Sequence, residues 1–177
     1  MGKSKEGVEA DWFGRLQSHL GEGYFKVAGT SLMYIRMAVF VRRELYYDIV
    51  HVKKDSEATG IGNMIGNKGA VAISFQLNES RFCFVGSHLA AHQTKVELRN
   101  ANVREIVKGI KLKAGEFPKA NEQTFDITHR FHYLFWCGDL NYRIDMPREN
   151  VLAMIQEQEW DILKLNDQLL NEKKKTL

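Results

Sequence analysis

The 177-residue sequence has only two cysteines and lacks any apolar run long enough to cross a bilayer. Cys83 and Cys137 are far apart, and each lies in an apolar run. This pattern indicates buried free thiols in a reducing compartment rather than a disulfide framework. Residues 1–6 have no apolar stretch behind their basic side chains, so they do not match a signal peptide. We therefore expect a cytoplasmic protein.

The sequence also lacks a strong charge of either sign. Its formal net charge is +3, which is too small to indicate a nucleic-acid partner and suits a protein that works near anionic lipid equally well. With 44% hydrophobic and 27% charged residues, the composition is that of a soluble globular protein. The length suffices for one domain with a hydrophobic core. We expect no nucleic-acid partner.

Apolar patterning predicts an α+β layered domain. Runs rich in Val, Ile, Tyr and Phe predict strands over 24–28, 32–41, 46–52, 71–77, 82–85 and 133–137. In 71–77 apolar and smaller residues alternate, which indicates one buried face. Apolar residues at helical spacing predict helices over 8–20 and 93–112, Pro147 opens another, and two short helices follow around Trp160 and Asp167. The polar stretch 113–130 is expected to be a surface loop or an ill-ordered insertion. Strands that precede helices argue against a regular βαβ series.

The segment Gly138–Arg143 directly follows a predicted core strand, where a rigid scaffold can hold catalytic groups. Asp139 and Asn141 lie two residues apart, so on an extended segment their side chains point the same way and can hold one water. The alternative is an Asx-type turn that closes the strand. Spacing alone leaves both interpretations open.

Two further segments carry candidate groups. His88 lies at the end of a predicted strand, where it can hydrogen-bond a phosphate oxygen or serve as a structural histidine. His92 lies four residues on, but no third zinc ligand is evident. The glycine-rich loop 59–69 fits neither dinucleotide-binding nor Walker spacing, and a strand follows it. It is a phosphate cradle with backbone amides and Lys68, or a plain mobile loop.

These motifs together resemble inositol polyphosphate 5-phosphatases. Three segments match that family in the same order and at similar spacing: Thr59-Gly60 with Gly66-Asn67-Lys68-Gly69-Ala70-Val71, then Ser87-His88-Leu89, then Phe135-Trp136-Cys137-Gly138-Asp139-Leu140-Asn141-Tyr142-Arg143. The last is similar to the family's first signature, apolar-Trp-x-Gly-Asp-x-Asn-Tyr-Arg. Residues 127–131 look like the branch that carries SH2 domains, and residues 142–147 are similar to synaptojanin. The resemblance covers the chain from about Trp12 onward.

The resemblance implies a four-layered α/β sandwich of the deoxyribonuclease-like, endonuclease-exonuclease-phosphatase type. It implies magnesium-dependent removal of the 5-phosphate from phosphoinositides or soluble inositol polyphosphates, with peripheral membrane contact. His88 then corresponds to the histidine that bonds the scissile phosphate, Asp139 to the carboxylate that positions or deprotonates the attacking water, and Asn141 to the amide beside it. Asn67 and Lys68 match the pair that contacts the lipid-side phosphate. Tyr142 and Arg143 belong to the signature and support the substrate site.

The departures from the family are informative. The family's magnesium-binding glutamate precedes the helix that opens this chain, and its second signature and a later catalytic histidine lie beyond Leu177. We therefore expect residues 1–177 to form one partial catalytic domain that is inactive alone, with its main metal ligand outside the chain. Two alternatives remain: a catalytically dead fragment that acts by binding, and a nuclease or phosphodiesterase of the same fold.

Overall fold

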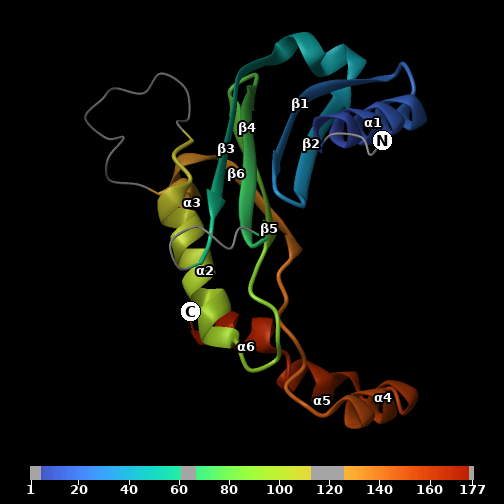
Figure 1. Ribbon diagram of the computed structural model, residues 1–177, viewed down its shortest axis with the longest axis vertical. Coiled ribbons are helices and arrows are strands. Elements are labelled where there is room, and N and C mark those ends of the chain that lie inside the picture. Colours follow the sequence, from blue (N-terminus) through green and yellow to red (C-terminus); the bar gives the residue numbers. More distant parts are fainter. Residues whose placement is uncertain (1–4, 61–66, 113–125, 176–177) are drawn as a thin grey trace.

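The computed structural model describes residues 5–60, 67–112 and 126–175. Its central element is a four-stranded sheet in the order β3 (Ile49–Ala58), β4 (Gly69–Leu77), β5 (Ser80–His88) and β6 (Tyr133–Asp139), shown in Figure 1. The first three strands are antiparallel, whereas β6 runs parallel to β5. The predicted strands 71–77, 82–85 and 133–137 are therefore confirmed, each with a few residues more.

The four-stranded sheet is one of four layers. Helix α1 (Lys5–Leu20) packs on a two-stranded antiparallel sheet of β1 (Tyr24–Leu32) and β2 (Ile35–Arg42), which packs on β3, β4 and β5. Helix α2 (Val96–Gly109) covers the opposite face (Figure 1). The contact between α1 and β1 is close, because a Cβ at Gly29 would lie 3.0 Å from the buried ring of Phe13. The order α, β, β, α is the four-layered sandwich that the resemblance implied.

Strand β4 is buried on both faces, so the expectation of one buried face is wrong. Ala70, Ala72 and their neighbours on β5 pack against Ile106 of α2. On the other face β1 and β2 cover Val71 and Ile73, both fully buried. A strand between two layers is apolar on both sides, and the small side chains of Ala70, Ala72 and Ser74 allow close packing there. The alternation in sequence was between large and small residues, not between buried and exposed ones.

Two other expectations are corrected. Residues 43–48, partly assigned to a strand, form the 3₁₀ helix η1 (Arg43–Asp48), in which the Tyr46 ring packs edge-on against Phe25 at 5.1 Å. The aromatic side chains thus close the end of the two-stranded sheet. The stretch 113–130 ends in a short helix, α3 (Ile127–Arg130), whose Thr128 amide donates to the Asp126 carboxylate at 2.9 Å. Residues 113–125 lie outside the described residues.

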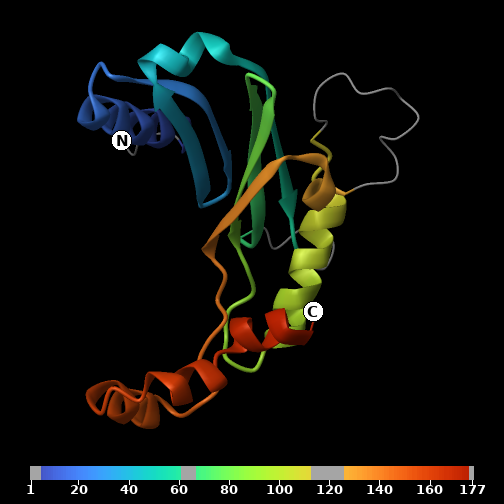
Figure 2. The ribbon, with the colours of Figure 1, turned by 180° about the vertical axis from the view of Figure 1, so that it is seen from behind.

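The edge strand β6 is only partly covered. Figure 2 shows β1 and β2 standing over one part of the sheet and leaving β6 open. Tyr133 and Phe135 are about half exposed and stack on Phe82 and Phe84 at 5.0 Å. Cys137 on the same strand is an exposed free thiol, so only Cys83 is buried as expected.

Helices connect and follow β6. The chain passes from β5 through α2 to β6, which makes a parallel crossover within the sheet. The other strand pairs among the described residues are antiparallel, so these residues form no regular βαβ series. Beyond β6 lie α4 (Arg148–Gln156), α5 (Trp160–Leu165) and α6 (Gln168–Lys175), which confirm the three helices predicted there. Helix α6 returns beside the start of α2, where Asn100 donates to Glu172 at 2.9 Å.

Candidate active site

Three strand ends meet at one edge of the four-stranded sheet. Because β5 and β6 are parallel, the last residues of the two strands, His88 and Asp139, are register partners. Strand β4 is antiparallel to β5 and pairs Gly69 with His88, which brings Lys68 to the same edge. Three chemically active groups from distant parts of the sequence therefore converge because of sheet topology. We call Lys68, His88 and Asp139 the strand-end cluster.

The histidine is the centre of the strand-end cluster. Its Nε2 lies 2.5 Å from the Lys68 Nζ and 3.5 Å from the Asp139 Oδ2. The His88 side chain is about one-third exposed and the Asp139 side chain about two-thirds, at 32% and 63%. Burial lowers the pKa of the Lys68 ammonium, and the negative charge of Asp139 opposes this effect. An anion that reaches this edge meets an ammonium and an imidazole beside a carboxylate open to water.

Gly138 explains why the two strand ends approach so closely. Its φ is +120°, and a Cβ there would lie 2.1 Å from the Ser87 carbonyl oxygen. Only glycine fits both the backbone conformation and the space. Next to it, the Trp136 indole donates to the Ser87 hydroxyl at 2.9 Å, which ties β6 to β5 close to both active groups. The Trp-x-Gly-Asp spacing is thus a packing requirement of the parallel pair.

After Asp139 the chain turns sharply. Asn141 has a positive φ of 56°, and its amide donates to Asp139 Oδ1 at 3.1 Å. This is the Asx-type turn considered above, so Asp139 and Asn141 do not point the same way along an extended segment. The Asn141 side chain instead donates to the Leu89 carbonyl at 3.0 Å, while the Leu89 amide donates to the Asp139 carbonyl at 3.0 Å. Because Oδ1 takes part in the turn, it is Oδ2 of Asp139 that faces His88.

The remaining predicted site residues surround this turn. Arg143 donates to Asn141 Oδ1 at 2.9 Å, so the Asn141 side chain both accepts a hydrogen bond through Oδ1 and donates one through Nδ2. Tyr142 donates to Asn100 Oδ1 at 2.5 Å and packs toward α2, apart from the strand-end cluster. Asn67 is exposed next to Lys68, whereas residues 61–66 of the predicted glycine-rich cradle lie outside the described residues.

Two polar residues near the site were not singled out from the sequence. Arg99 on α2 and Gln168 on α6 are both buried, and the Arg99 Nη2 donates to Gln168 Oε1 at 2.6 Å. The same oxygen accepts from the Arg143 amide at 2.9 Å. Polar residues at helical positions are ordinarily exposed, so no local pattern marked these two as internal.

The described residues do not form a magnesium site by themselves. No group of three or more His, Cys, Asp and Glu side chains suited to a metal occurs in the described part of the chain. Magnesium favours several oxygen ligands in octahedral geometry, but the strand-end cluster offers one carboxylate. Asp139 Oδ1 already accepts from the Asn141 amide, and Asn141 Oδ1 accepts from Arg143. We therefore assign no chemical step to a metal ion.

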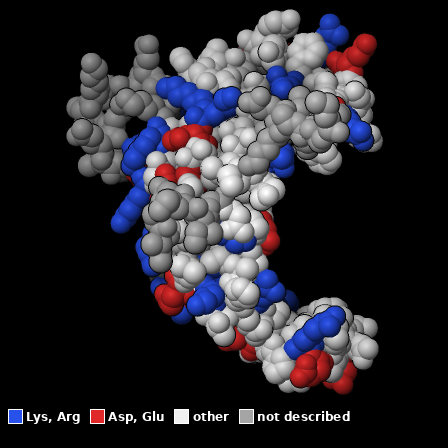
Figure 3. Space-filling view, in the orientation of Figure 1, with Lys and Arg blue, Asp and Glu red and all other residues white. Residues whose placement is uncertain are grey.

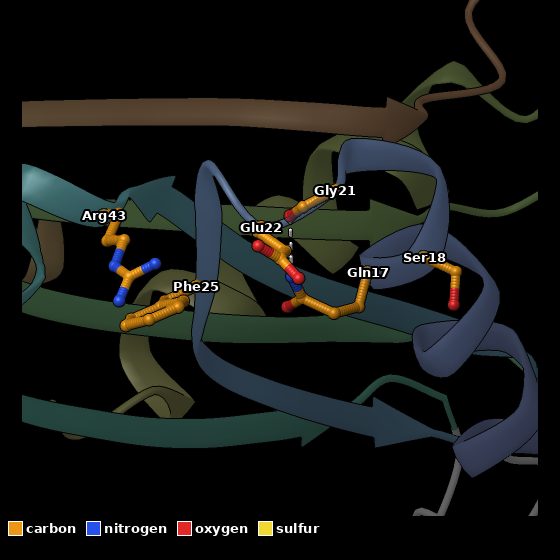
Figure 4. A pocket seen from close by; sticks show the side chains of 6 residues that line it. All are labelled: Gln17, Ser18, Gly21, Glu22, Phe25 and Arg43. Atoms are coloured by element: carbon orange, nitrogen blue, oxygen red, sulfur yellow. Dashed lines mark hydrogen bonds between the residues drawn. The ribbon is translucent and has the colours of Figure 1, made fainter.

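A separate cavity of about 660 Å³ lies between the end of α1, the start of β1 and η1. Figure 4 shows Gln17 and Glu22 on one side of it and Arg43 beside the Phe25 ring on the other. Gln17 donates to the Tyr24 carbonyl, which fixes the turn between α1 and β1. None of its lining residues belongs to the strand-end cluster.

Comparison with known proteins identifies relatives of the sequence. The chain is 41% identical over 152 residues to phosphatidylinositol 3,4,5-trisphosphate 5-phosphatase 2B of Danio rerio, an alignment that covers 86% of this chain and 12% of that protein. It is 39% identical over 150 residues to synaptojanin-1 of Homo sapiens, covering 85% of this chain and 9% of that protein. The chain therefore spans about a tenth of the length of these curated relatives.

The fold has solved counterparts. The inositol polyphosphate 5-phosphatase domain of SPsynaptojanin, in complex with inositol (1,4)-bisphosphate and calcium ion, superposes with a TM-score of 0.74 at 30% identity, covering 97% of this chain and 46% of that one. A Cimex nitrophorin superposes with a TM-score of 0.66 at 18% identity, which shows the fold alone. The model of the endonuclease/exonuclease/phosphatase family 2 matches residues 2–177. The match over nearly the whole chain and the four-layered fold show that the chain belongs to the endonuclease/exonuclease/phosphatase family 2.

Proposed function

We propose that residues 1–177 are one part of a catalytic domain that hydrolyses the 5-phosphate of phosphoinositides or soluble inositol polyphosphates. The observation that carries the proposal is the strand-end cluster. In it the Lys68 ammonium and the exposed Asp139 carboxylate both lie within 3.5 Å of the His88 Nε2. Support comes from relatives that are named as phosphatidylinositol 3,4,5-trisphosphate 5-phosphatases.

Each group has a distinct task in this proposal. Phosphate-ester hydrolysis needs donors to take up charge on the phosphoryl oxygens and a water held in line with the leaving oxygen. His88 donates to an oxygen of the scissile phosphate, and the neighbouring Lys68 ammonium lies 2.5 Å from its Nε2. Asp139 Oδ2 accepts a proton from the attacking water, because Oδ1 is occupied by the Asn141 amide. Asn141 and Arg143 hold the carboxylate's orientation, and Asn67 and Lys68 contact a phosphate that is not cleaved.

The proposal includes magnesium and an incomplete catalytic set. A calcium ion accompanies the inositol bisphosphate in the SPsynaptojanin structure, and the cluster here supplies too few oxygen ligands for such an ion. The magnesium ligands would then come mainly from residues outside the strand-end cluster. The chain alone is expected to release little phosphate.

The proposed setting is cytoplasmic, at the cytosolic face of membranes that carry phosphoinositides. Figure 3 shows Lys and Arg gathered along the flank where β3 and α2 lie, a surface suited to weak contact with anionic lipid. Exposed members of this flank include Lys54, Arg104, Lys108 and Lys111. Among the described residues, no helix combines the length and apolarity needed to span a bilayer.

The test uses a grafted domain, in which this chain replaces the matching segment of the SPsynaptojanin 5-phosphatase domain. We expect the grafted domain to release phosphate from phosphatidylinositol 4,5-bisphosphate in the presence of magnesium and not from phosphatidylinositol 4-phosphate. The chain alone and a duplex DNA substrate serve as comparisons. Equal release from both lipids, or DNA cleavage without inositol-phosphate hydrolysis, would overturn the proposal in favour of a nuclease or phosphodiesterase of the same fold.

A further inference from the structure

Arg99 is a fully buried arginine on the first turns of α2, with 0% of its surface exposed. Its guanidinium makes four hydrogen bonds: Nη1 donates to the carbonyls of Ala90 at 3.1 Å and His92 at 2.7 Å, and Nη2 to the carbonyl of Gln93 at 3.4 Å and to Gln168 Oε1 at 2.6 Å. It also lies 5.0 Å from the centre of the Tyr142 ring. Every one of these partners follows one of the two active strand ends or lies on α6.

Burial of the Arg99 guanidinium costs free energy, which suggests that the side chain has a role beyond packing. A guanidinium loses its hydration on burial, and here burial lowers the pKa of Arg99 while Tyr142 opposes the shift. The Nε atom is buried with no hydrogen-bond partner among the described residues. The other donors bind neutral carbonyl and amide oxygens, which recover less electrostatic energy than a carboxylate would. An aliphatic side chain would suit simple packing of α2 better.

The backbone that Arg99 holds is conformationally strained. His92 has a positive φ of 76°, an uncommon conformation for a histidine, and its carbonyl accepts the shortest of the backbone bonds from Arg99. The segment from Ala90 to Gln93 leads directly from His88 into α2 and has no regular secondary structure until the helix begins. Without the guanidinium, its three carbonyls lose their common donor.

The second strand end is held through Gln168. Its Oε1 accepts from both Arg99 and the Arg143 amide, and its Nε2 donates to the Gln93 carbonyl at 2.9 Å. Arg143 in turn holds Asn141, which also has a positive φ. One buried pair, Arg99 and Gln168, therefore connects the segment after His88 with the turn after Asp139.

We propose that Arg99 is a positioning residue, which acts through Gln168 and the 90–93 backbone to fix His88 relative to Asp139. The catalytic consequence rests on the proposed function, whereas the positioning itself does not. Direct ties between the two strand ends also exist: the Trp136 bond to Ser87, and the bonds that join Leu89 to Asp139 and Asn141. Farther along, the Gln93 side chain donates to the carbonyls of Ile144 at 3.2 Å and Met146 at 3.3 Å. The Arg99 network holds both segments at points farther along the chain. The segments are therefore prevented from rotating about the hydrogen bonds at the strand ends.

The first experiment measures amide hydrogen exchange in the 177-residue chain with Arg99→Met, Arg99→Lys and the control Ile106→Val. Ile106 is fully buried on the same helix but packs on the sheet. We expect Arg99→Met to speed exchange of the Leu89 and Asn141 amides by about ten- to a hundredfold, the equivalent of one charge-assisted hydrogen bond. Amides of Ala72 and Val85 should change less than about threefold. Arg99→Lys should retain part of the protection that Arg99→Met loses. Ile106→Val should change the exchange rates of the Leu89 and Asn141 amides no more than those of the Ala72 and Val85 amides.

Exchange that rises equally in all four amides of Arg99→Lys would mean a general loss of stability and would overturn the proposal. Unchanged exchange of the Leu89 and Asn141 amides in Arg99→Met would overturn the proposal as well. In the grafted domain, Arg99→Lys should lower kcat by about tenfold with KM nearly constant, because misplacement acts on the transition state. Unchanged kcat would refute the catalytic consequence. A grafted domain that hydrolyses no inositol phosphate even with Arg99 in place refutes the proposed function, and the exchange result then still decides the positioning.

Discussion

Replacing Asp139 by asparagine removes a negative charge from the strand-end cluster while preserving its shape. The carboxamide oxygen of the new side chain can still accept from the Asn141 amide, as the Asp139 Oδ1 now does at 3.1 Å. The contact between Asp139 and His88 is 3.5 Å, and the carboxylate is 63% exposed. Even a fully charged pair at such an exposed position contributes less than about 1 kcal/mol to stability. The variant should therefore fold normally.

Turnover should respond far more strongly than stability. A positioned general base contributes about 10²- to 10⁴-fold, which corresponds to about 2.7–5.4 kcal/mol of activation free energy. We expect kcat of the Asp139→Asn grafted domain to fall within this range with KM changed by less than about threefold, because the carboxylate acts in the chemical step. Asp145→Asn, at an exposed carboxylate after the turn, is the matched control and should keep full activity. Initial rates of phosphate release at varied substrate concentration measure both constants, and a kcat within about threefold of the parent would refute the assignment of Asp139 as the base.

Three further predictions address other parts of the chain. Lys68→Ala should raise KM by about tenfold or more for inositol substrates with a 1-phosphate and scarcely for those without it, since a charge-assisted contact contributes about 1.5–3 kcal/mol; equal effects on both would mean that the ammonium acts through His88. Gly138→Ala should lower the free energy of unfolding in denaturant by at least about 2 kcal/mol, because strain at positive φ adds to the clash with Ser87, while Gly23→Ala, with open space around it, should change little. Burial raises the pKa of the Cys83 thiol to about 12, so at pH 8 a thiol reagent should modify one cysteine in the native chain and two after unfolding; rapid labelling of both native thiols would contradict the buried position.

Much of the strand layout could be predicted because it depends on local pattern. The run from Tyr133 to Cys137 is apolar and short, and it forms β6. Position at a strand end also directed attention to His88 and Asp139, which the structure brings together. The family resemblance supplied their roles, since spacing alone left both an Asx turn and a catalytic pair open. The turn is present, and the carboxylate oxygen that the turn leaves unused faces His88.

What escaped prediction depends on long-range packing. Whether β4 is covered on one face or two depends on where β1 and β2 lie, which no period in residues 69–77 records. Arg99 is an ordinary arginine in a helical sequence, and only the meeting of α2 with α6 buries it against Gln168. The exposure of Cys137 likewise follows from the limited reach of the two-stranded sheet over β6, not from its apolar neighbours.

The register of β5 and β6 decides whether the site exists at all. Side chains on a strand alternate between faces, so a slip of one residue would pair His88 with Gly138 and turn the neighbouring Trp136 away from Ser87. The Trp136 bond to Ser87 and the Gly138 approach to the Ser87 backbone both hold only in the observed register. The signature residues before Asp139 therefore act by fixing this pairing, and those after it act by holding the turn. Asp139 needs both, because its carboxylate reaches His88 only if the strand ends in register and the chain turns at once.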